Sequence, residues 1–268
     1  MALIITGLLL RQYSQYMKNP FGQAVHTTLN RFGLELRLTR NLQAARERER
    51  AERQLEPWRL LQHYDVRTVL DIGANEGQFA KLIRDLCPRT LVYSFEPLPD
   101  IHILLQRRFR NDPSVVPVPC GLSDGAGRVV MNRSTFSPSS SLLPMAELHR
   151  TEYPHSAPQT TVEVDVQRLD DWMTASGLKA GPHVLVKLDV QGHELAVIRG
   201  GINTLRQARF AIVEVSFFEL YERQPLFDGI YRELRALGYV YRGSLEQTFS
   251  HQQDRILFAD ALFENIFD

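Results

Sequence analysis

The fold of this chain is decided by the stretch VLDIGANEGQF at residues 69–79. Its apolar first part predicts a buried strand, which ends in an acidic turn with two glycines, and the turn predicts the start of a helix. Gly73 can adopt backbone angles that are closed to other residues and lets a ligand approach the main chain, while Gly77 lets the helix pack close to the strand. The stretch therefore predicts an α/β fold with a cradle for a nucleoside cofactor.

The turn lacks the glycines of a dinucleotide site. That pattern reads G-x-G-x-x-G, and counting from Gly73 places Asn75 and Gln78 at the second and third glycine positions. The second glycine is the one that admits a pyrophosphate. Asp71 supplies a carboxylate and Asn75 an amide, so the turn suits a ligand with an ammonium group and no phosphate. S-adenosylmethionine fits this description better than NAD does.

Composition limits the classes of function. The chain has 268 residues with 44% hydrophobic content, enough for one large core or a core with an appendage. Lys+Arg and Asp+Glu each total 31, so no global basic field attracts nucleic acid, and we expect no nucleic-acid partner. The two cysteines, Cys87 and Cys120, have no metal-ligand or redox spacing, and no His/Cys grouping indicates a metal site.

The sequence of residues 1–65 predicts an N-terminal helical extension without catalytic or binding motifs. The apolar run from Ala2 to Leu10 is about half as long as a membrane-spanning helix, and the basic residues follow it instead of preceding it as in a signal peptide. We expect no stable membrane insertion and a cytoplasmic protein. A first helix that packs on the body or on a second subunit, forming a homo-oligomer, is favoured over association with a membrane surface. The alternating charges of Arg46 to Arg53 are typical of a solvated helix face.

From Arg67 the pattern changes to short apolar runs that alternate with helix-length segments, which predicts a parallel sheet with crossover helices in a domain over 66–268. The expected strands are 68–72, 91–95, 115–118, 184–188, 210–215, 239–241 and 255–258, and the expected helices are 77–86, 100–109, 194–205 and 230–237.

Residues 124–165 depart from this alternation and predict an inserted hairpin and lid. Arg128 to Met131 and Thr161 to Val166 are the expected extended segments, and the polar stretch Ser134 to Ser141 lies between them. Long loops within compact domains tend to be lids or binding loops, although a merely flexible surface loop is the alternative.

Polar residues follow the predicted strands where the chain leaves the sheet, at Asp71, Glu96, Ser123-Asp124 and Asp189. A ligand of an open parallel sheet lies over these carboxyl ends. Glu96 falls about twenty residues after the glycine turn, where an acid can accept hydrogen bonds from both ribose hydroxyls, and Pro97 fixes the chain after it. Asp124 is either a contact to an adenine amino group or a turn residue before Gly125.

A second turn repeats the layout of the first and reads KLDVQGHE at residues 187–194. Lys187 and Asp189 are two residues apart, so they point to one face of the strand and can pair with each other or with substrate. Glu194 lies near a helix start, where the helix dipole also stabilises a carboxylate without any further role. We interpret Asp189, Lys187 and Glu194 as catalytic candidates.

His193 and Glu214 complete the catalytic candidates. His193 is the most tempting general base, with a surface histidine at a helix start as the alternative. Glu214 interrupts an otherwise apolar strand, and a buried carboxylate needs a partner. Lys187 is the expected partner if the two strands are neighbours. Tyr221 belongs to an aromatic cluster that we interpret first as packing and second as acceptor-pocket lining.

With these residues assembled, the chain resembles the FkbM family of S-adenosylmethionine-dependent methyltransferases. The resemblance covers roughly Val69 to Phe258. It depends on the order and spacing of the segments DIGANEG at 71–77, FEP at 95–97, LSD at 122–124, SSSL at 139–142, LDDW at 169–172, KLDVQGHE at 187–194 and QD at 253–254.

The resemblance implies a Rossmann-like class I methyltransferase fold, with a mostly parallel seven-stranded sheet flanked by helices. It implies S-adenosylmethionine as cofactor and places Asp189 near the methyl group, whereas the position of His193 is not fixed in the family's pattern. The cofactor-binding candidates are Asp71, Gly73, Ala74, Asn75, Gly77, Phe79, Glu96, Pro97, Ser123 and Asp124.

The function we expect is O-methylation of a hydroxyl on a sugar, a glycan or a polyketide-type natural product. Methyl transfer depends mostly on alignment of the acceptor, and a hydroxyl acceptor also loses a proton. Asp189 is expected to handle the acceptor, with Lys187 and Glu194 as orienting partners. The alternatives are a cofactor-binding interaction module and, less favoured, an NAD-dependent oxidoreductase.

Overall fold

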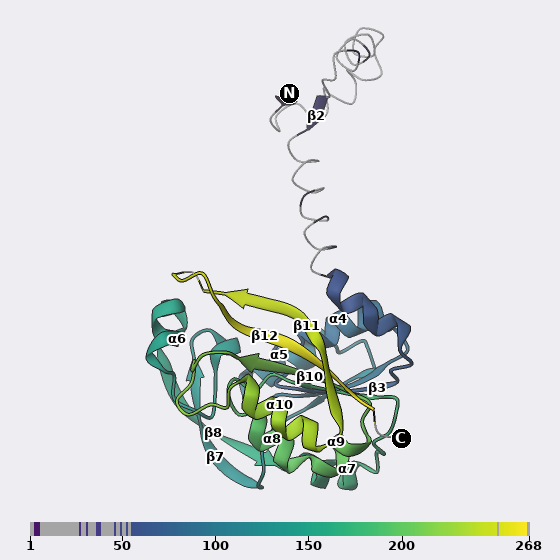
Figure 1. Ribbon diagram of the computed structural model, residues 1–268, viewed down its shortest axis with the longest axis vertical. Helices are drawn as coiled ribbons and strands as arrows, with labels where there is room; N and C mark the ends of the chain where they lie inside the picture. The colour runs from purple at the N-terminus through teal and green to yellow at the C-terminus, as the bar shows by residue number, and fades with distance from the viewer. Residues whose placement is uncertain are drawn as a thin grey trace. The chain divides into compact units, whose positions relative to one another are not determined.

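The structure is a computed structural model, and it describes residues 55–250 and 252–266 together with positions 3–5, 27, 31, 36–38, 46, 49 and 52. The chain divides into two compact units, Met1–Trp58 and Arg59–Asp268 (Figure 1). Each unit is described by itself.

The first unit contains a pair of short parallel strands, β1 (Leu3–Ile5) and β2 (Leu36–Leu38). The prediction of a helix over Ala2 to Leu10 is therefore wrong at Leu3–Ile5, whose isoleucines favour extended backbone. Arg46, Glu49 and Glu52 are helical and exposed. The other residues of the expected helical extension, and with them the expected subunit contact, lie outside the described part of the chain.

The second unit is built on a seven-stranded sheet with the order β11-β12-β10-β9-β3-β4-β5. Strands β10, β9, β3, β4 and β5 are parallel, and β12 runs antiparallel to both of its neighbours. The strands are β3 (Thr68–Ile72), β4 (Leu91–Phe95), β5 (Val115–Val118), β9 (Val184–Leu188), β10 (Phe210–Ser216), β11 (Tyr239–Phe249) and β12 (Ile256–Asn265). This mostly parallel sheet confirms the predicted fold class.

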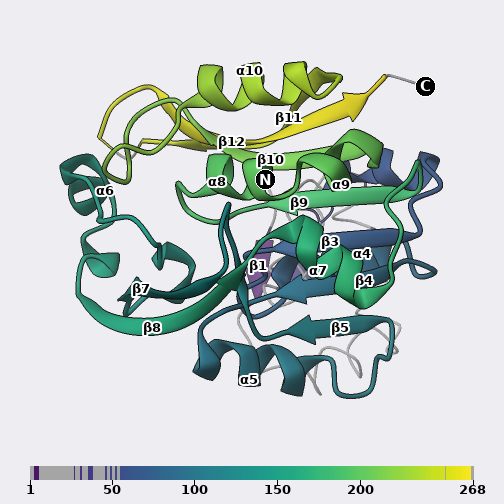
Figure 2. The same cartoon turned by 90° about the horizontal axis from the view of Figure 1, so that it is seen from below.

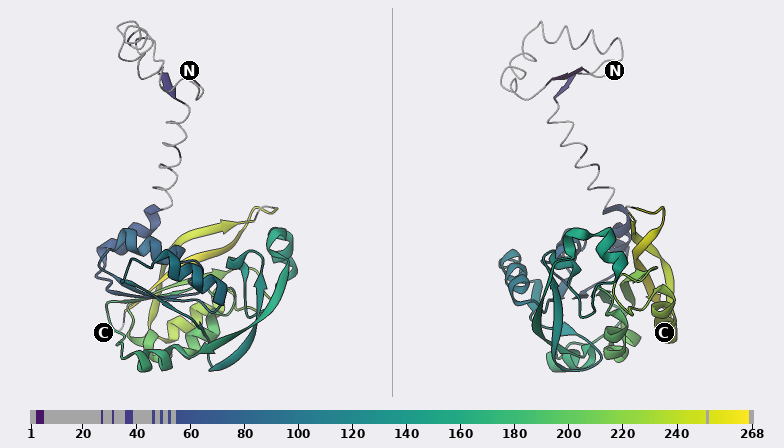
Figure 3. Two further views of the ribbon diagram at one scale, coloured as in Figure 1. Left: turned by 180° about the vertical axis from the view of Figure 1, so that it is seen from behind. Right: turned by 90° about the vertical axis from the view of Figure 1, so that its left-hand side faces the viewer.

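Helices cover both faces of the sheet (Figures 1 and 3). They are α4 (Gln78–Leu86), α5 (Pro99–Arg108), α7 (Leu169–Ser176), α8 (Glu194–Gly200), α9 (Ile202–Gln207) and α10 (Phe227–Ala236), and the 3-10 helix η2 (Glu56–His63) precedes β3. Side chains of α7 to α10 pack on Leu70, Ile72 and Val186 in the main core. Helices α4 and α5 lie on the other face. The strands are buried on both sides, which explains their nearly continuous apolar sequences.

The strand order reverses between β3 and β9, because the chain passes from β3 to β4 and β5 on one side and from β9 to β10 on the other. Ligands of open α/β sheets bind outside the carboxyl ends of the strands at such a point. The turns after β3 and β9 both lie there, so the topology brings the two quoted sequence motifs together.

Most predicted helices and strands differ from the structure by at most three residues at an end, but three predictions differ by more. The helix expected over 194–205 is two helices, α8 and α9, with Gly201 between them. A Cβ at Gly201 would lie only 2.8 Å from Leu169 Cδ2, so a glycine is needed where the chain bends. Strands β11 and β12 extend well past Tyr241 and Phe258 and pair with each other along their length. Exposed polar residues on β11, which forms the sheet edge, concealed its length in the sequence.

The insert lies beyond the carboxyl ends of β4 and β5 (Figure 2). It contains β7 (Gly127–Ser134), which pairs antiparallel with β8 (Gln159–Gln167), and β6 (Gly121–Leu122) joins β8 in parallel. Between β7 and β8 the chain forms η3 (Ser137–Ser139), α6 (Glu147–Glu152) and η4 (Pro154–Ser156). Val164 and Val166 of β8 pack on Leu98 and Ile101, so the insert has its own small core with α5.

Candidate active site

The glycine turn (residues 73–77) and the acid turn (residues 189–193) touch each other through their main chains. Gly73 has φ +85°, and a Cβ on it would lie 1.9 Å from the carbonyl oxygen of Asp189. The amide of Asp189 donates to the carbonyl of Ile72 at 3.0 Å. Gly73 is therefore required for the contact between the two turns, which the sequence motif alone did not reveal.

Gly77 and Phe79 pack in ways that differ from the expectation. Gly77 has φ +83°, and a Cβ on it would lie 2.7 Å from Leu105 Cδ1 and 2.4 Å from Phe109 Cε2. Its close contact is thus with α5 and the residue after it, whereas the sequence predicted close packing of α4 on the strand. The ring of Phe79 lies 5.7 Å from Nζ of Lys187, within the range of a cation–π contact.

Glu96 follows β4 and is 4% exposed. One carboxylate oxygen accepts from the amide of Asn75 at 3.0 Å and the other from the amide of Leu98 at 2.8 Å. Burial raises its pKa to about 7, although these two hydrogen bonds oppose the rise. A carboxylate oxygen can accept more than one hydrogen bond, so each retains capacity for a ligand hydroxyl. Pro97, which follows Glu96, is half-buried. Ala74 in the glycine turn is buried.

Ser123, Asp124 and His193 form a separate polar group. The hydroxyl of Ser123 donates to Asp124 Oδ1 at 3.2 Å and lies 2.9 Å from Nε2 of His193. Burial lowers the pKa of His193, and the nearby charge of Asp124 partly opposes this effect. His193 is half-buried, so it is not the exposed surface histidine that was the alternative expectation. Its Nε2 contacts Ser123, and no hydrogen bond to Asp189 is observed for it.

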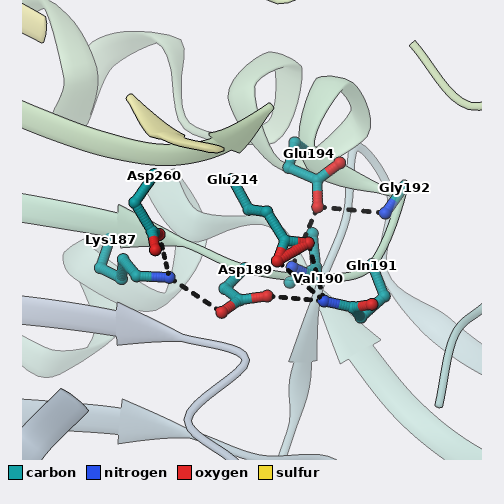
Figure 4. Close-up of polar contacts among 8 residues, drawn as sticks. All are labelled: Lys187, Asp189, Val190, Gln191, Gly192, Glu194, Glu214 and Asp260. Atoms are coloured by element: carbon teal, nitrogen blue, oxygen red, sulfur yellow. Dashed lines mark hydrogen bonds and ion pairs between the residues drawn. The ribbon is translucent and has the colours of Figure 1, made fainter. Parts of the chain in front are cut away.

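Lys187 lies inside the sheet and is 4% exposed. Its ammonium is 2.9 Å from Asp189 Oδ2 and 3.3 Å from Asp260 Oδ1 (Figure 4). Burial alone would lower its pKa, but the charges of Asp189 and Asp260 raise the pKa above its ordinary value. Lys187 therefore remains a cation although it is removed from water.

Asp71 lies directly opposite Lys187 in the register of β3 and β9 and is 2% exposed. The hydroxyl of Ser94 donates to it at 3.3 Å. Burial raises its pKa to about 7, and the charge of Lys187 opposes this rise. The structure thus places Asp71 beneath the glycine turn and within the sheet.

Glu214 does not pair with Lys187 as the sequence suggested. Strands β9 and β10 are neighbours, but Glu214 Oε1 accepts from the amide of Gln191 at 2.9 Å, and Lys187 binds Asp189 and Asp260 instead. Burial, followed by the charges of Asp189 and Asp260, raises the pKa of Glu214 well above its ordinary value. Glu214 therefore keeps its proton to a higher pH than an ordinary glutamate does.

Asp189 is the charged member of this carboxyl pair. Burial would raise its pKa, but the ammonium of Lys187 and hydrogen bonds from Gln191 and Glu214 hold the pKa below its ordinary value. A protonated Glu214 can donate to Asp189, which satisfies both carboxyl groups with one proton. We call Asp189 and Glu214 the acid pair.

Glu194 stabilises the acid turn through hydrogen bonds to its main chain. It is buried, and its Oε1 accepts from the amides of Val190 at 3.0 Å and Gly192 at 3.1 Å. Burial raises its pKa to about 7 against these hydrogen bonds. Gln191 has φ +52° and Gly192 has φ +93°, so Glu194 stabilises a turn with two consecutive residues in the left-handed region.

The sequence model of the methyltransferase FkbM domain matches residues 71–241, which is more than half of the chain and includes both turns. The chain belongs to this family. The resemblance stated from the sequence is thereby confirmed.

Two relatives of this chain have named activities. 2-O-methyltransferase NoeI of Sinorhizobium fredii (strain NBRC 101917 / NGR234) is 32% identical over 58% of this chain and 66% of its own length. Hexuronic acid methyltransferase AglP of Haloferax volcanii is 32% identical over 54% of each protein. The matched segment thus spans less than two thirds of either relative. The crystal structure of methyltransferase FkbM from Methylobacillus flagellatus KT aligns over 75% of this chain and 44% of its own, at 14% identity and a TM-score of 0.47.

The insert contacts both turns. We call residues 137–141 the serine segment. The hydroxyl of Ser137 accepts from the side-chain amide of Asn75 at 3.1 Å, and the hydroxyl of Ser141 donates to the carbonyl of Gln191 at 2.6 Å. Asn75 has φ +48°, so this contact holds a turn residue in an uncommon conformation.

Sequence reasoning missed Asp260 and Gln191 as parts of the site. Asp260 interrupts the apolar residues of β12 just as Glu214 interrupts β10, and the same signal could have identified it. It lies beyond the FkbM match, which ends at residue 241. Gln191 belongs to the KLDVQGHE motif, but it is an uncharged residue in a turn and does not interrupt an apolar strand, so it was not selected as a site residue.

Within the described ranges, no group of three or more His, Cys, Asp or Glu side chains is arranged to hold a metal ion. A helix with the length and apolarity needed to cross a membrane is also absent from that part of the chain.

Proposed function

We propose that this chain is an S-adenosylmethionine-dependent O-methyltransferase that acts on a hydroxyl of a sugar or glycan. The observation that carries the proposal is the position of Asp189, which is charged beside the buried Lys187 and lies where the glycine turn meets the acid turn. The names of NoeI and AglP, a 2-O-methyltransferase and a hexuronic acid methyltransferase, support a sugar acceptor.

The residues at the strand ends suit S-adenosylmethionine. Glu96 has free acceptor capacity for ribose hydroxyls, and the Ser123-Asp124 loop, in which Asp124 is exposed, would contact the adenine. The glycine turn would hold the methionine end, and Asp71 would add negative charge beneath it for the ammonium group. When bound, S-adenosylmethionine would supply a methyl group on a sulfonium.

The chain's own contribution would be to orient the acceptor and take its proton. Asp189 is the proposed base, because Lys187 favours its ionised form whereas burial favours the protonated form of Glu214. Lys187 and Glu194 act through Asp189 and through the acid turn, respectively. His193 is bonded to Ser123, so its proposed role is to position the adenine loop.

The test is to measure cofactor binding and methyl transfer separately. Isothermal calorimetry with S-adenosylmethionine, S-adenosylhomocysteine and NAD⁺ identifies the cofactor. Transfer of a radiolabelled methyl group to a panel of neutral sugars, uronic acids and glycosides identifies the acceptor class. Binding of NAD⁺ alone would indicate an oxidoreductase, and cofactor binding without transfer to any acceptor would favour an interaction module.

A further inference from the structure

The side-chain amide of Gln191 connects the acid pair to Tyr221. Its Nε2 donates to Asp189 Oδ1 at 2.8 Å and to Glu214 Oε1 at 2.9 Å, and its Oε1 accepts from the hydroxyl of Tyr221 at 2.8 Å. A primary amide has two N–H donors, so both are used by the acid pair. Gln191 therefore uses both of its N–H donors on the acid pair and accepts a hydrogen bond from Tyr221.

Tyr221, together with the charge of Asp189, favours one orientation of the amide. It is 2% exposed, and its hydroxyl also lies 3.1 Å from the carbonyl of Ser139 in the serine segment. A hydroxyl that donates to Gln191 Oε1 keeps the N–H groups directed at the acid pair. The reversed amide would direct its carbonyl oxygen at the charged Asp189, which is unfavourable. The backbone of Gln191 is held as well, because Ser141 donates to its carbonyl.

Several charged or titratable groups face the acid pair from the surrounding elements. They are Lys187 of β9, Asp71 of β3, Asp260 of β12, Glu194 of α8, Tyr153 after α6 and Tyr221 after β10. Lys187 is in contact with Asp189 but is bonded to Asp260 on its other side. The ammonium of Lys187 therefore favours the charged form of Asp189. The contact between Asp189 and Glu214 depends on Gln191, which donates to both, and on the proton that they share.

We propose that Gln191 is a positioning residue whose amide, oriented by the hydroxyl of Tyr221, holds Asp189 and Glu214 together so that they share one proton and Asp189 remains charged. This inference rests on the proposed function, in which Asp189 accepts the proton of the acceptor hydroxyl. Loss of the amide removes a donor from the charged Asp189, so the pKa of Asp189 rises and less of it is ionised at a given pH.

The acid pair can be observed without any acceptor, by ¹³C NMR of carboxyl carbons during a pH titration. Gln191→Met removes the amide at similar volume, and Tyr221→Phe removes only the hydroxyl. The matched control is Tyr239→Phe. Tyr239 is also buried, but it begins β11, and its hydroxyl lies 2.8 and 2.9 Å from the carbonyl oxygens of Leu205 and Ala208, which precede β10. Spectra of D189N and E214Q assign the resonances.

We expect the midpoint of Asp189 to rise by about one to two pH units in Gln191→Met, because the variant removes a hydrogen bond that stabilises the charged form of Asp189. Tyr221→Phe should shift it in the same direction by less. Tyr239→Phe should lower Tm without moving the midpoint.

An unchanged Asp189 midpoint in Tyr221→Phe and Gln191→Met would overturn the inference, and so would an equal shift in Tyr239→Phe. If Gln191→Met does not fold, the comparison of the two tyrosine variants decides. Calorimetry with S-adenosylmethionine on the same samples tests the proposed function independently, because failure to bind it refutes methyl transfer whatever the carboxyl midpoints show.

Discussion

The carboxylate of Asp260 lies 3.3 Å from the ammonium of Lys187 and connects the antiparallel strand β12 to the acid turn. Through this contact and the 2.9 Å contact to Asp189, Lys187 neutralises negative charge from two strands. A buried cation with two carboxylate partners is stable only as a set, because each member left alone would carry an uncompensated charge.

Lys187→Met should therefore lower the free energy of unfolding by about 3–5 kcal/mol, measured by urea denaturation at pH 7. The control is Lys81→Met, which breaks an ion pair with Asp85 whose side chains are both more than half exposed. That change should cost less than about 1 kcal/mol. Equal losses in the two variants would contradict the structural importance of the buried cation.

Asp189→Asn should lower kcat by about 10²–10⁴-fold while leaving the affinity for S-adenosylmethionine nearly unchanged, because an amide cannot take the acceptor's proton. The control is Asp228→Asn, at an exposed aspartate of α10. Full turnover of Asp189→Asn with the wild-type pH profile would refute the role of Asp189 as base.

Gly73→Ala should destabilise the fold by about 2 kcal/mol or more, because the new Cβ collides with the carbonyl of Asp189 and the backbone is left-handed. Gly177→Ala is the control that separates the cost of the collision from the cost of the left-handed backbone. Gly177 has φ +71° but open space around it, so only the conformational cost of about 1 kcal/mol applies. Thermal unfolding of both variants measures the difference, and similar losses would exclude the collision.

Glu194 should make stability depend on pH. Its pKa is about 7 in the folded protein and 4.5 ordinarily, so the folded state binds the proton more tightly. This stabilisation is complete below pH 4.5 and is lost as the pH rises to about 7. Glu194→Gln retains the oxygen that accepts two amides and should reduce the slope of stability against pH by at most about 1.4 kcal/mol per unit. Denaturant titrations from pH 5 to 8 measure the slope, and the exposed Glu163→Gln should leave it unchanged.

Ser137→Ala should weaken binding of S-adenosylmethionine by about five-fold, since it removes one hydrogen bond that holds Asn75 in the glycine turn. Calorimetry gives the affinity. Ser176→Ala, which removes a hydroxyl bonded to the carbonyl of Met173 at the end of α7, should bind as the wild type does. If Ser137→Ala also binds normally, the insert does not contribute to the cofactor site.

Much of the fold could be predicted because its signals are local. Strands 68–72, 91–95, 115–118 and 184–188 have the predicted bounds, since each is a short apolar run followed by a turn. Errors occurred where the sequence pattern is weak. The edge strand β11 carries alternating polar residues, and Gly201 divides a helix through contact with Leu169, which is distant in the sequence.

The kinds of residue at the strand ends can be read from the sequence alone: the glycines and acid of the first turn, Glu96 after β4, and the lysine and acids of the second turn. These follow from spacing along a single strand and its turn. The partner of each acid, in contrast, is visible only in the folded chain. Lys187 binds Asp260 and not Glu214, and Gln191 joins the acid pair, because strand register and side-chain packing set these distances. The sequence already indicated Asp189 as the residue that handles the acceptor, but the charge of a buried carboxyl depends on such neighbours and is therefore a property of the assembled sheet.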